Sequence, residues 1–266
     1  MSFWSFHQIG IVSLKLISFA MKLSQFRVHI ILSIFIMIPF ALLSQKGINE
    51  VDMESIPYKK VRSYILKQQT DSHVNTFADI QPTCQNQSEF EGFSTFSRTF
   101  VIKANLADVW TTYISSSPIT LWKTRKSAVG MVYNRVTDEL SYSNDTCSGS
   151  ELGQVMYLNL KLVKGLYKLA TALEITDIQD ENGVIEISYL EFGKNEGKQL
   201  ISMNDNGYGY TVITHTSIIK SGSALRDKLL YPYFHNRLIN SFHKNMKQRV
   251  YALSQAKSSV ASAYEN

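Results

Sequence analysis

The chain has 266 residues, of which 44% are hydrophobic and 12% aromatic, enough for the packed core of one domain with an appendage. Its formal net charge is +5, but residues 1–44 hold three basic residues and no acidic one, which leaves 24 basic and 22 acidic side chains elsewhere. So balanced a remainder argues against nucleic-acid binding, and we expect no nucleic-acid partner. The basic run of Lys123, Arg125 and Lys126 is expected to be a solvated loop.

The N-terminus has the pattern of an export signal. Residues 28–43 are almost wholly apolar, follow Lys22 and Arg27, and end in a plausible cleavage region before Gln45. We predict that residues 1–44 form a signal peptide of a bacterial periplasmic, envelope or secreted protein. The alternative is an uncleaved anchor that associates with the membrane. Residues 1–20 either precede a true start at Met21 or lengthen the apolar region.

Cys84 and Cys147 are the two cysteines of the chain. An oxidising compartment would permit a disulfide between them, but sequence does not fix the pairing, so paired and unpaired thiols both stay open. Two cysteines without histidines at ligand spacing do not supply four metal ligands. We therefore expect neither a metal site nor a cofactor.

Residues 45–92 are predicted to be a linker with one short helix. Pro57 suits the first position of a helix over residues 58–69, in which Tyr58, Val61 and Ile65 share one face. This face is expected to lean on the main domain, whereas residues 71–91 are polar and expected to be irregular.

The main domain is predicted over residues 93–256 and starts with a strand over residues 97–103. A helix follows over residues 105–115, with Asn105 as its cap and Asp108 three residues later. The apolar stripe expected to be buried consists of Leu106, Val109, Trp110, Tyr113 and Ile114.

Alternating apolar and polar residues then predict a run of strands from about residue 129 to residue 220. Turns are expected at residues 180–183 and 204–207, because Asn-Gly supplies the positive φ that hairpins require. The short spacings leave no room for crossover helices, so we expect an antiparallel meander. An amphipathic helix with a kink or a new start at Pro232 closes the domain, and residues 257–266 are expected to be a disordered tail.

These elements together resemble the START-like (SRPBCC, Bet v 1-like) superfamily of helix-grip domains. The most familiar piece is Phe100-Val-Ile-Lys-Ala-Asn-Leu-Ala-Asp-Val-Trp110, where the first strand enters the first helix. The resemblance implies an α+β fold, in which a curved antiparallel sheet wraps around the long C-terminal helix. It also implies a hydrophobic cavity for lipids, sterols, polyketides or similar molecules. The signal segment and the helix that precede the domain depart from the usual pattern.

Residues that would face such a cavity come from alternate strand positions and one face of the last helix. Our candidates for ligand binding are Trp110, Trp122, Tyr157, Tyr189, Glu191, Tyr210, His215, Tyr233, Phe242 and Met246. His215 would orient a ligand carbonyl or hydroxyl, or be a hydrogen-bonded core residue. Glu191 is either a buried acid or, as we favour, an exposed strand end. His235 and His243 lie about 12 Å apart along a helix, too far to share a metal, and are expected at the surface or an interface.

We predict an exported protein that binds a small hydrophobic, lipid-like molecule non-covalently between the sheet and the C-terminal helix, rather than an enzyme. One alternative is an enzyme of the same fold with cyclase- or hydratase-type acid–base chemistry, for example Glu191 with His215 or Tyr210. The other is an interaction module whose cavity is filled with side chains. The sequence contains no nucleophile elbow, zinc-protease motif or phosphate-binding glycine loop.

Overall fold

The computed structural model describes residues 45–84, 90–223 and 226–264. The chain divides into two units, residues 1–44 and 45–266, so the predicted signal or anchor lies outside the described residues. Among the residues described, no helix combines the length and the apolar character that a membrane span requires.

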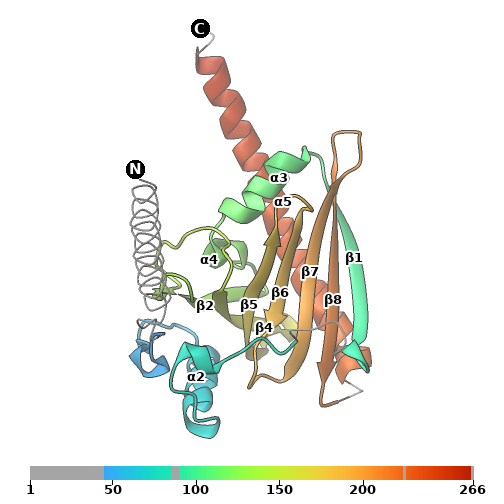
Figure 1. Cartoon of the computed structure of the whole chain (residues 1–266). Coiled ribbons are helices and arrows are strands. Elements are labelled where there is room, and N and C mark those ends of the chain that lie inside the picture. Colours follow the sequence, from blue (N-terminus) through green and yellow to red (C-terminus); the bar gives the residue numbers. More distant parts are fainter. Residues whose placement is uncertain (1–44, 85–89, 224–225, 265–266) are drawn as a thin grey trace, which may run out of the picture. The chain divides into compact units, whose positions relative to one another are not determined.

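One antiparallel sheet of eight strands organises the second unit (Figure 1). The strands are β1 (Ser94–Ile102), β2 (Ser127–Asn134), β3 (Glu139–Tyr142), β4 (Gln154–Leu162), β5 (Tyr167–Gln179), β6 (Val184–Tyr189), β7 (Asn195–Asp205) and β8 (Thr211–Ser221). Their order in the sheet is β1-β8-β7-β6-β5-β4-β2-β3, so β4 to β8 form the expected meander, and β1 pairs with β8.

Helices and helical turns cover one face of the sheet, the face against which the C-terminal helix packs. They are α3 (Leu106–Ser115), α4 (Pro118–Leu121), the π-helical turn η5 (Arg226–Leu230) and the long α5 (Tyr231–Tyr264). Asn105 caps α3 as predicted, because its side chain accepts a hydrogen bond from the backbone N–H of Asp108 at 2.8 Å. The predicted α+β helix-grip architecture is therefore confirmed.

The core between sheet and helix contains the inward positions of the strands together with α3 and α5. Val109 and Tyr113 of α3 meet Phe242 and Met246 of α5 there, and all four are buried. The predicted disordered tail is wrong as far as residue 264, because α5 continues to Tyr264. Residues 257–264 contain no glycine or proline, and Lys257 Nζ lies 2.6 Å from Asp108 Oδ1.

A second core covers the opposite face of the sheet. It packs α2 (Lys59–Asp71) and the short turns η1 (Ile48–Glu50) and η2 (Phe77–Asp79) against β2, β4 and β5. The predicted linker is thus an integral layer of the domain, and residues 71–91 include the buried Phe77 and Ile80. Residues 45–266 form a compact unit, and the described residues of this unit build both cores, so we expect it to fold without residues 1–44.

Gly130 allows α2 to approach the sheet closely. The register of β2 shifts between Val129 and Met131, and a Cβ atom on Gly130 would lie 3.0 Å from a methyl group of Val61. The predicted contact of the Val61 and Ile65 face with the main domain is confirmed, since both side chains are fully buried.

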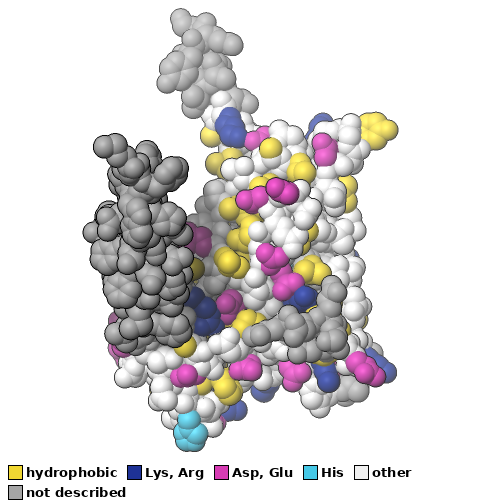
Figure 2. All heavy atoms as spheres, in the orientation of Figure 1, with side chains coloured by type: hydrophobic (Ala, Val, Ile, Leu, Met, Phe, Trp, Pro, Cys, Tyr) yellow, Lys and Arg dark blue, Asp and Glu magenta, His cyan; other side chains and the backbone are white. Residues whose placement is uncertain are grey.

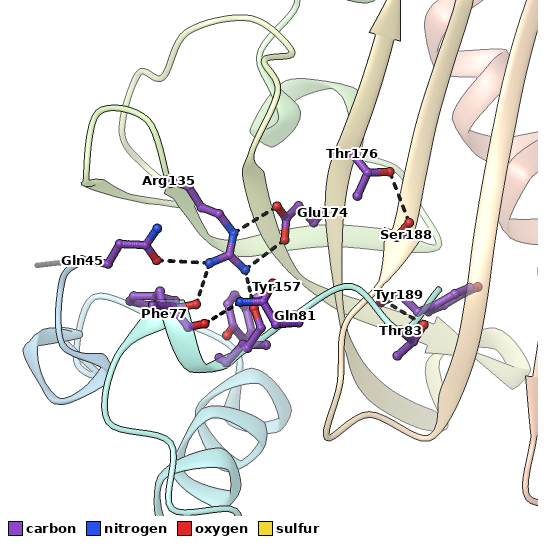
Figure 3. Close-up of polar contacts among 12 residues, drawn as sticks. Gln45, Phe77, Gln81, Thr83, Arg135, Tyr157, Glu174, Thr176, Ser188 and Tyr189 are labelled. Carbon is purple, nitrogen blue, oxygen red and sulfur yellow. Dashed lines mark hydrogen bonds and ion pairs between the residues drawn. The ribbon is translucent and has the colours of Figure 1, made fainter. Parts of the chain in front are cut away.

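Arg135 ties the N-terminal layer to the sheet (Figure 3). Its guanidinium donates two hydrogen bonds to the carboxylate of Glu174, at 3.0 and 2.9 Å. It also donates to the carbonyl oxygens of Phe77 at 2.6 Å and Ile80 at 2.5 Å. The side chains of Arg135 and Glu174 are only 14% and 8% exposed. Because water cannot stabilise these buried charges, each charge is stabilised by the other.

We expect R135M to lower the free energy of unfolding of residues 45–266 by about 3–5 kcal/mol, because it leaves the Glu174 carboxylate buried without its partner. The double variant R135M/E174M should recover part of that loss. K67M, which removes an exposed pair with Asp71, is the matched control and should cost less than about 1 kcal/mol. Urea denaturation measures all three, and equal losses in R135M and K67M would contradict the role of this pair.

Candidate functional site

A chain of hydrogen bonds crosses the interior between the sheet and the helices. Tyr113 Oη of α3 lies 2.8 Å from His243 Nδ1 of α5, and His243 Nε2 lies 2.9 Å from His215 Nδ1 of β8. His215 Nε2 lies 2.9 Å from Oε1 of Gln199 on β7. These four side chains, which we call the interior relay, join four elements of the grip: α3, α5, β8 and β7.

All hydrogen bonds of the interior relay donate in the same direction, from Tyr113 toward Gln199. Gln199 Oε1 is an acceptor, so His215 must donate from Nε2 and accept at Nδ1. His243 therefore donates from Nε2 and accepts the Tyr113 hydroxyl proton at Nδ1. Both imidazoles are neutral, and every ring nitrogen of the two histidines has a partner.

A second polar group extends the relay toward the start of α5. Gln199 Nε2 donates to Tyr189 Oη at 3.4 Å, and Tyr189 Oη lies 2.7 Å from Tyr231 Oη. Tyr231 stacks on His235 with ring centroids 4.7 Å apart. His235 Nε2 in turn lies 2.5 Å from Ser217 Oγ on β8.

Burial keeps these groups uncharged. Desolvation lowers the pKa of His215 to about 3, and it also lowers the pKa of His235 and His243, each of which lies near His215. The same cause raises the pKa of Tyr113 and raises that of Tyr189 to about 12. At neutral pH the interior is therefore polar but carries no net charge.

The prediction that His235 and His243 lie at the surface or an interface is wrong. They are 6% and 2% exposed, and both face the sheet. Their rings lie 5.8 and 5.1 Å from the ring of His215, which places one histidine of β8 between two histidines of α5. Their spacing of eight residues is two helical turns, and the sheet rather than solvent covers that face of α5.

Six predicted ligand-binding residues belong to this core. Trp122, Tyr189, His215, Phe242 and Met246 are buried in it, and Trp122 packs on Phe242 with centroids 4.6 Å apart. Trp110 is partly buried at its edge, where its indole N–H donates to Asp180 at 3.1 Å.

The other four predicted residues do not face the core under α5. Tyr157 is fully buried on the opposite face, where it donates to Gln68 of α2, because its neighbours Met156 and Leu158 take the inward positions. Glu191 is exposed beyond the end of β6, the placement that we favoured from sequence. Tyr210 lies in the β7–β8 turn, and Tyr233 is 55% exposed on the outer side of α5.

The residues predicted for the site did not include Gln199, Ser217, Tyr231 and Tyr113. Gln199 and Ser217 stand opposite each other at inward positions of β7 and β8. The sequence did contain one indication of their role. Ser217 occupies an inward position of β8 between the inward Ile213 and Ile219, and a polar residue among apolar ones at such positions is unusual.

The structure forms no disulfide between Cys84 and Cys147, the pairing that the sequence left open. Cys147 packs against the core under α5, near α4, and burial raises its pKa. Within residues 45–84, 90–223 and 226–264, no group of three or more histidine, cysteine or acidic side chains is arranged to hold a metal ion.

The arrangement suits hydrogen bonding better than acid–base catalysis. The hydrogen bonds described for the three histidines go to other histidines, a tyrosine, a glutamine and a serine, and none goes to a carboxylate. A histidine with a pKa near 3 is a weak base, since an efficient general base has a pKa near the working pH. Such groups orient a hydroxyl or carbonyl group in apolar surroundings only by exchanging one of their present hydrogen bonds for it.

No protein-family model matches the chain, and no curated protein matches it. Solved structures of similar fold include norcoclaurine synthase from Thalictrum flavum, with 13% identity, 64% of this chain and 94% of that chain covered, and a TM-score of 0.44. A major latex-like protein from Panax ginseng has 10% identity over 59% and 96% of the two chains, with a TM-score of 0.44. A Nitrosomonas europaea protein has 12% identity over 62% and 96%, with a TM-score of 0.42. The resemblance to the START-like superfamily is confirmed at the level of architecture, by the strand order and the closing helix.

The neutral histidines make stability depend on pH. Unfolded histidines bind protons below about pH 6.5, whereas native His215 does so only near pH 3. The native state is therefore stabilised above about pH 6.5, and this stabilisation is lost as the pH falls toward 3. From pH 7 to pH 5 we expect His215 to lower the free energy of unfolding by about 2 kcal/mol, and His235 and His243 to change it in the same direction.

Urea denaturation of residues 45–266 at pH 7 and pH 5 measures this loss. H243Q should make the pH dependence weaker, because it removes one of the three buried neutral histidines. H73N is the matched control, since His73 is exposed and asparagine tolerates its φ of 53°. A free energy of unfolding that is equal at the two pH values would show that the native histidines are not held neutral.

Proposed function

We propose that residues 45–266 form a binding protein that holds a small, mainly apolar molecule between the sheet and α5. A hydroxyl or carbonyl group of this ligand hydrogen-bonds to the polar side chains inside the grip. The observation that carries the proposal is the interior relay, a chain of buried polar groups within an otherwise apolar core. A core selected for stability alone is better served by apolar residues of similar volume.

The start of α5 is the part of the grip best suited to admit a ligand. η5 is a π-helical turn, and Pro232 at the second position of α5 has no backbone N–H to donate. Tyr231, which precedes this proline, is the first residue of α5 and is hydrogen-bonded to Tyr189 of the sheet. If the first turns of α5 move away from the sheet, a ligand oxygen takes the place of Tyr231 on Tyr189 and one hydrogen bond replaces another.

The packed interior favours a second candidate, an interaction module without a ligand. Tyr113, Phe242 and Met246 are at most 3% exposed, and the polar groups beside them satisfy one another. In that case the relay fixes the position of α5 and the function lies on the outer surface.

We also propose, from the pattern of residues 22–44, that the protein is exported or anchored in a membrane by its N-terminus. Fractionation of cells that express the full chain, with mass determination of its mature N-terminus, distinguishes cleavage near residue 44 from an uncleaved anchor. A full-length chain in the cytoplasmic fraction would contradict both.

Native mass spectrometry with solvent extraction of purified residues 45–266 tests the ligand proposal. We expect an apolar molecule at about one per chain, or uptake of a hydrophobic fluorescent probe that carries a carbonyl group. Y189F should weaken binding of that probe by roughly three- to tenfold, the range expected for one lost hydrogen bond. Y233F removes an exposed hydroxyl from α5 and should leave binding unchanged.

If no molecule copurifies and the probe does not bind, the ligand proposal is wrong and the interaction module remains. Equal effects of Y189F and Y233F on probe affinity would place the probe outside the grip.

A further inference from the structure

The tip of the β4–β5 hairpin presents apolar side chains to solvent. Val163, Leu166 and Tyr167 are 51%, 88% and 55% exposed, and none of them belongs to either core. Val163 and Lys164 have φ values of 47° and 54°, and Gly165 has 92°. A left-handed conformation is strained for a β-branched residue such as valine, and such strain is concentrated at functional sites.

The first turns of α5 continue this surface. Leu230 and Tyr233 are 50% and 55% exposed there. A groove of about 270 Å³, open solvent included, lies between the hairpin and the helix, and its lining includes Val163, Phe234 and Arg237. The two exposed apolar groups therefore belong to one face of the molecule.

The segments that contribute to this face are rich in basic residues. Residues 123–126, 161–168 and 226–237 contain nine lysines and arginines and one acidic residue, and Lys126, Lys161 and Arg237 line the groove itself. That acid, Asp227, is buried and accepts hydrogen bonds from Ser221. Lys126 and Lys161 both line the groove, which brings the first of these segments to the second. The face shown in Figure 2, in contrast, carries acidic and basic side chains interspersed.

We propose that this surface, the basic apolar face formed by residues 123–126, 161–168 and 226–237, docks on a bilayer that contains anionic lipids. Leu166 and Tyr167 enter the interfacial region, and the surrounding lysines and arginines contact the lipid phosphates. Charge complementarity favours a bilayer, because each basic side chain near an anionic surface strengthens binding roughly fivefold. Proteins that bind membrane surfaces insert apolar side chains and are also attracted electrostatically to anionic lipids. An apolar hairpin tip with lysines beside it provides both interactions.

The basic apolar face is distinct from the N-terminal membrane association considered so far, and it gives the run of Lys123, Arg125 and Lys126 a further role. The sequence suggested association through the N-terminus, and it suggested that the run Lys123, Arg125 and Lys126 is only solvated. The face also includes the start of α5, where we place ligand entry. Its docking does not depend on the ligand, so each proposal can fail without the other.

Sedimentation with vesicles tests the docking, using residues 45–266 because the apolar run in residues 28–43 would bind bilayers by itself. Wild type should bind vesicles of phosphatidylcholine mixed with phosphatidylglycerol, bind pure phosphatidylcholine weakly, and dissociate as the salt concentration rises. L166S/Y167S should bind the mixed vesicles about tenfold more weakly or worse, because it removes the inserting side chains. Y208S is the matched control, since Tyr208 is 85% exposed at the tip of another hairpin.

Circular dichroism and thermal unfolding should show both variants folded like wild type, because the substituted side chains are exposed. The proposal is overturned if wild type ignores the mixed vesicles, or if L166S/Y167S binds them as well as Y208S does. It is also overturned if the basic apolar face instead joins two copies, in which case wild type elutes as a dimer in gel filtration and L166S/Y167S as a monomer.

Discussion

The burial of both faces of the sheet is the constraint on which the rest of this structure depends. In β4, Val155 and Tyr157 point to one face and Met156 and Leu158 to the other, and all four are buried. An antiparallel sheet often leaves one face to water, with polar residues at every second position. Here both faces need a cover, which α5 supplies on one side and residues 45–84 on the other.

This constraint explains why a charged pair lies within the N-terminal layer. Arg135 follows β2, and its guanidinium binds both Glu174 of β5 and carbonyl groups of the residues that cover the sheet. Those carbonyl groups lie at the start and just beyond the end of the turn η2, outside any strand pairing, and a planar donor with five N–H groups can bind several oxygens together. The pair therefore fixes where the N-terminal layer lies on the sheet.

On the other face, polar groups are buried without charge. The interior relay links α3, α5 and two strands through neutral hydrogen bonds, and His235 adds a further contact between α5 and β8. Each bond contributes little net stability, but each group would be costly if it lost its partner. The relay therefore specifies one position of α5 on the sheet, and a ligand that shifts the helix must offer replacement partners. Our proposal places such an exchange at the Tyr189–Tyr231 end, because the helix begins irregularly there.

The sequence by itself determined the local elements and their order. The alternation in residues 155–162, the turns after β5 and β7, and the Asn105 cap depend on neighbours along the chain, and the structure contains all of them. Only the tertiary structure decided which residues meet, because period-two alternation does not say what covers each face. Tyr157 was expected under α5 and lies against α2, and His243 was expected at the surface or an interface and lies against His215. Apart from the helix whose Val61 and Ile65 face was expected to pack on the domain, residues 45–92 carried too little periodicity to reveal that they form a layer, and their burial depends on a sheet that comes later in the chain.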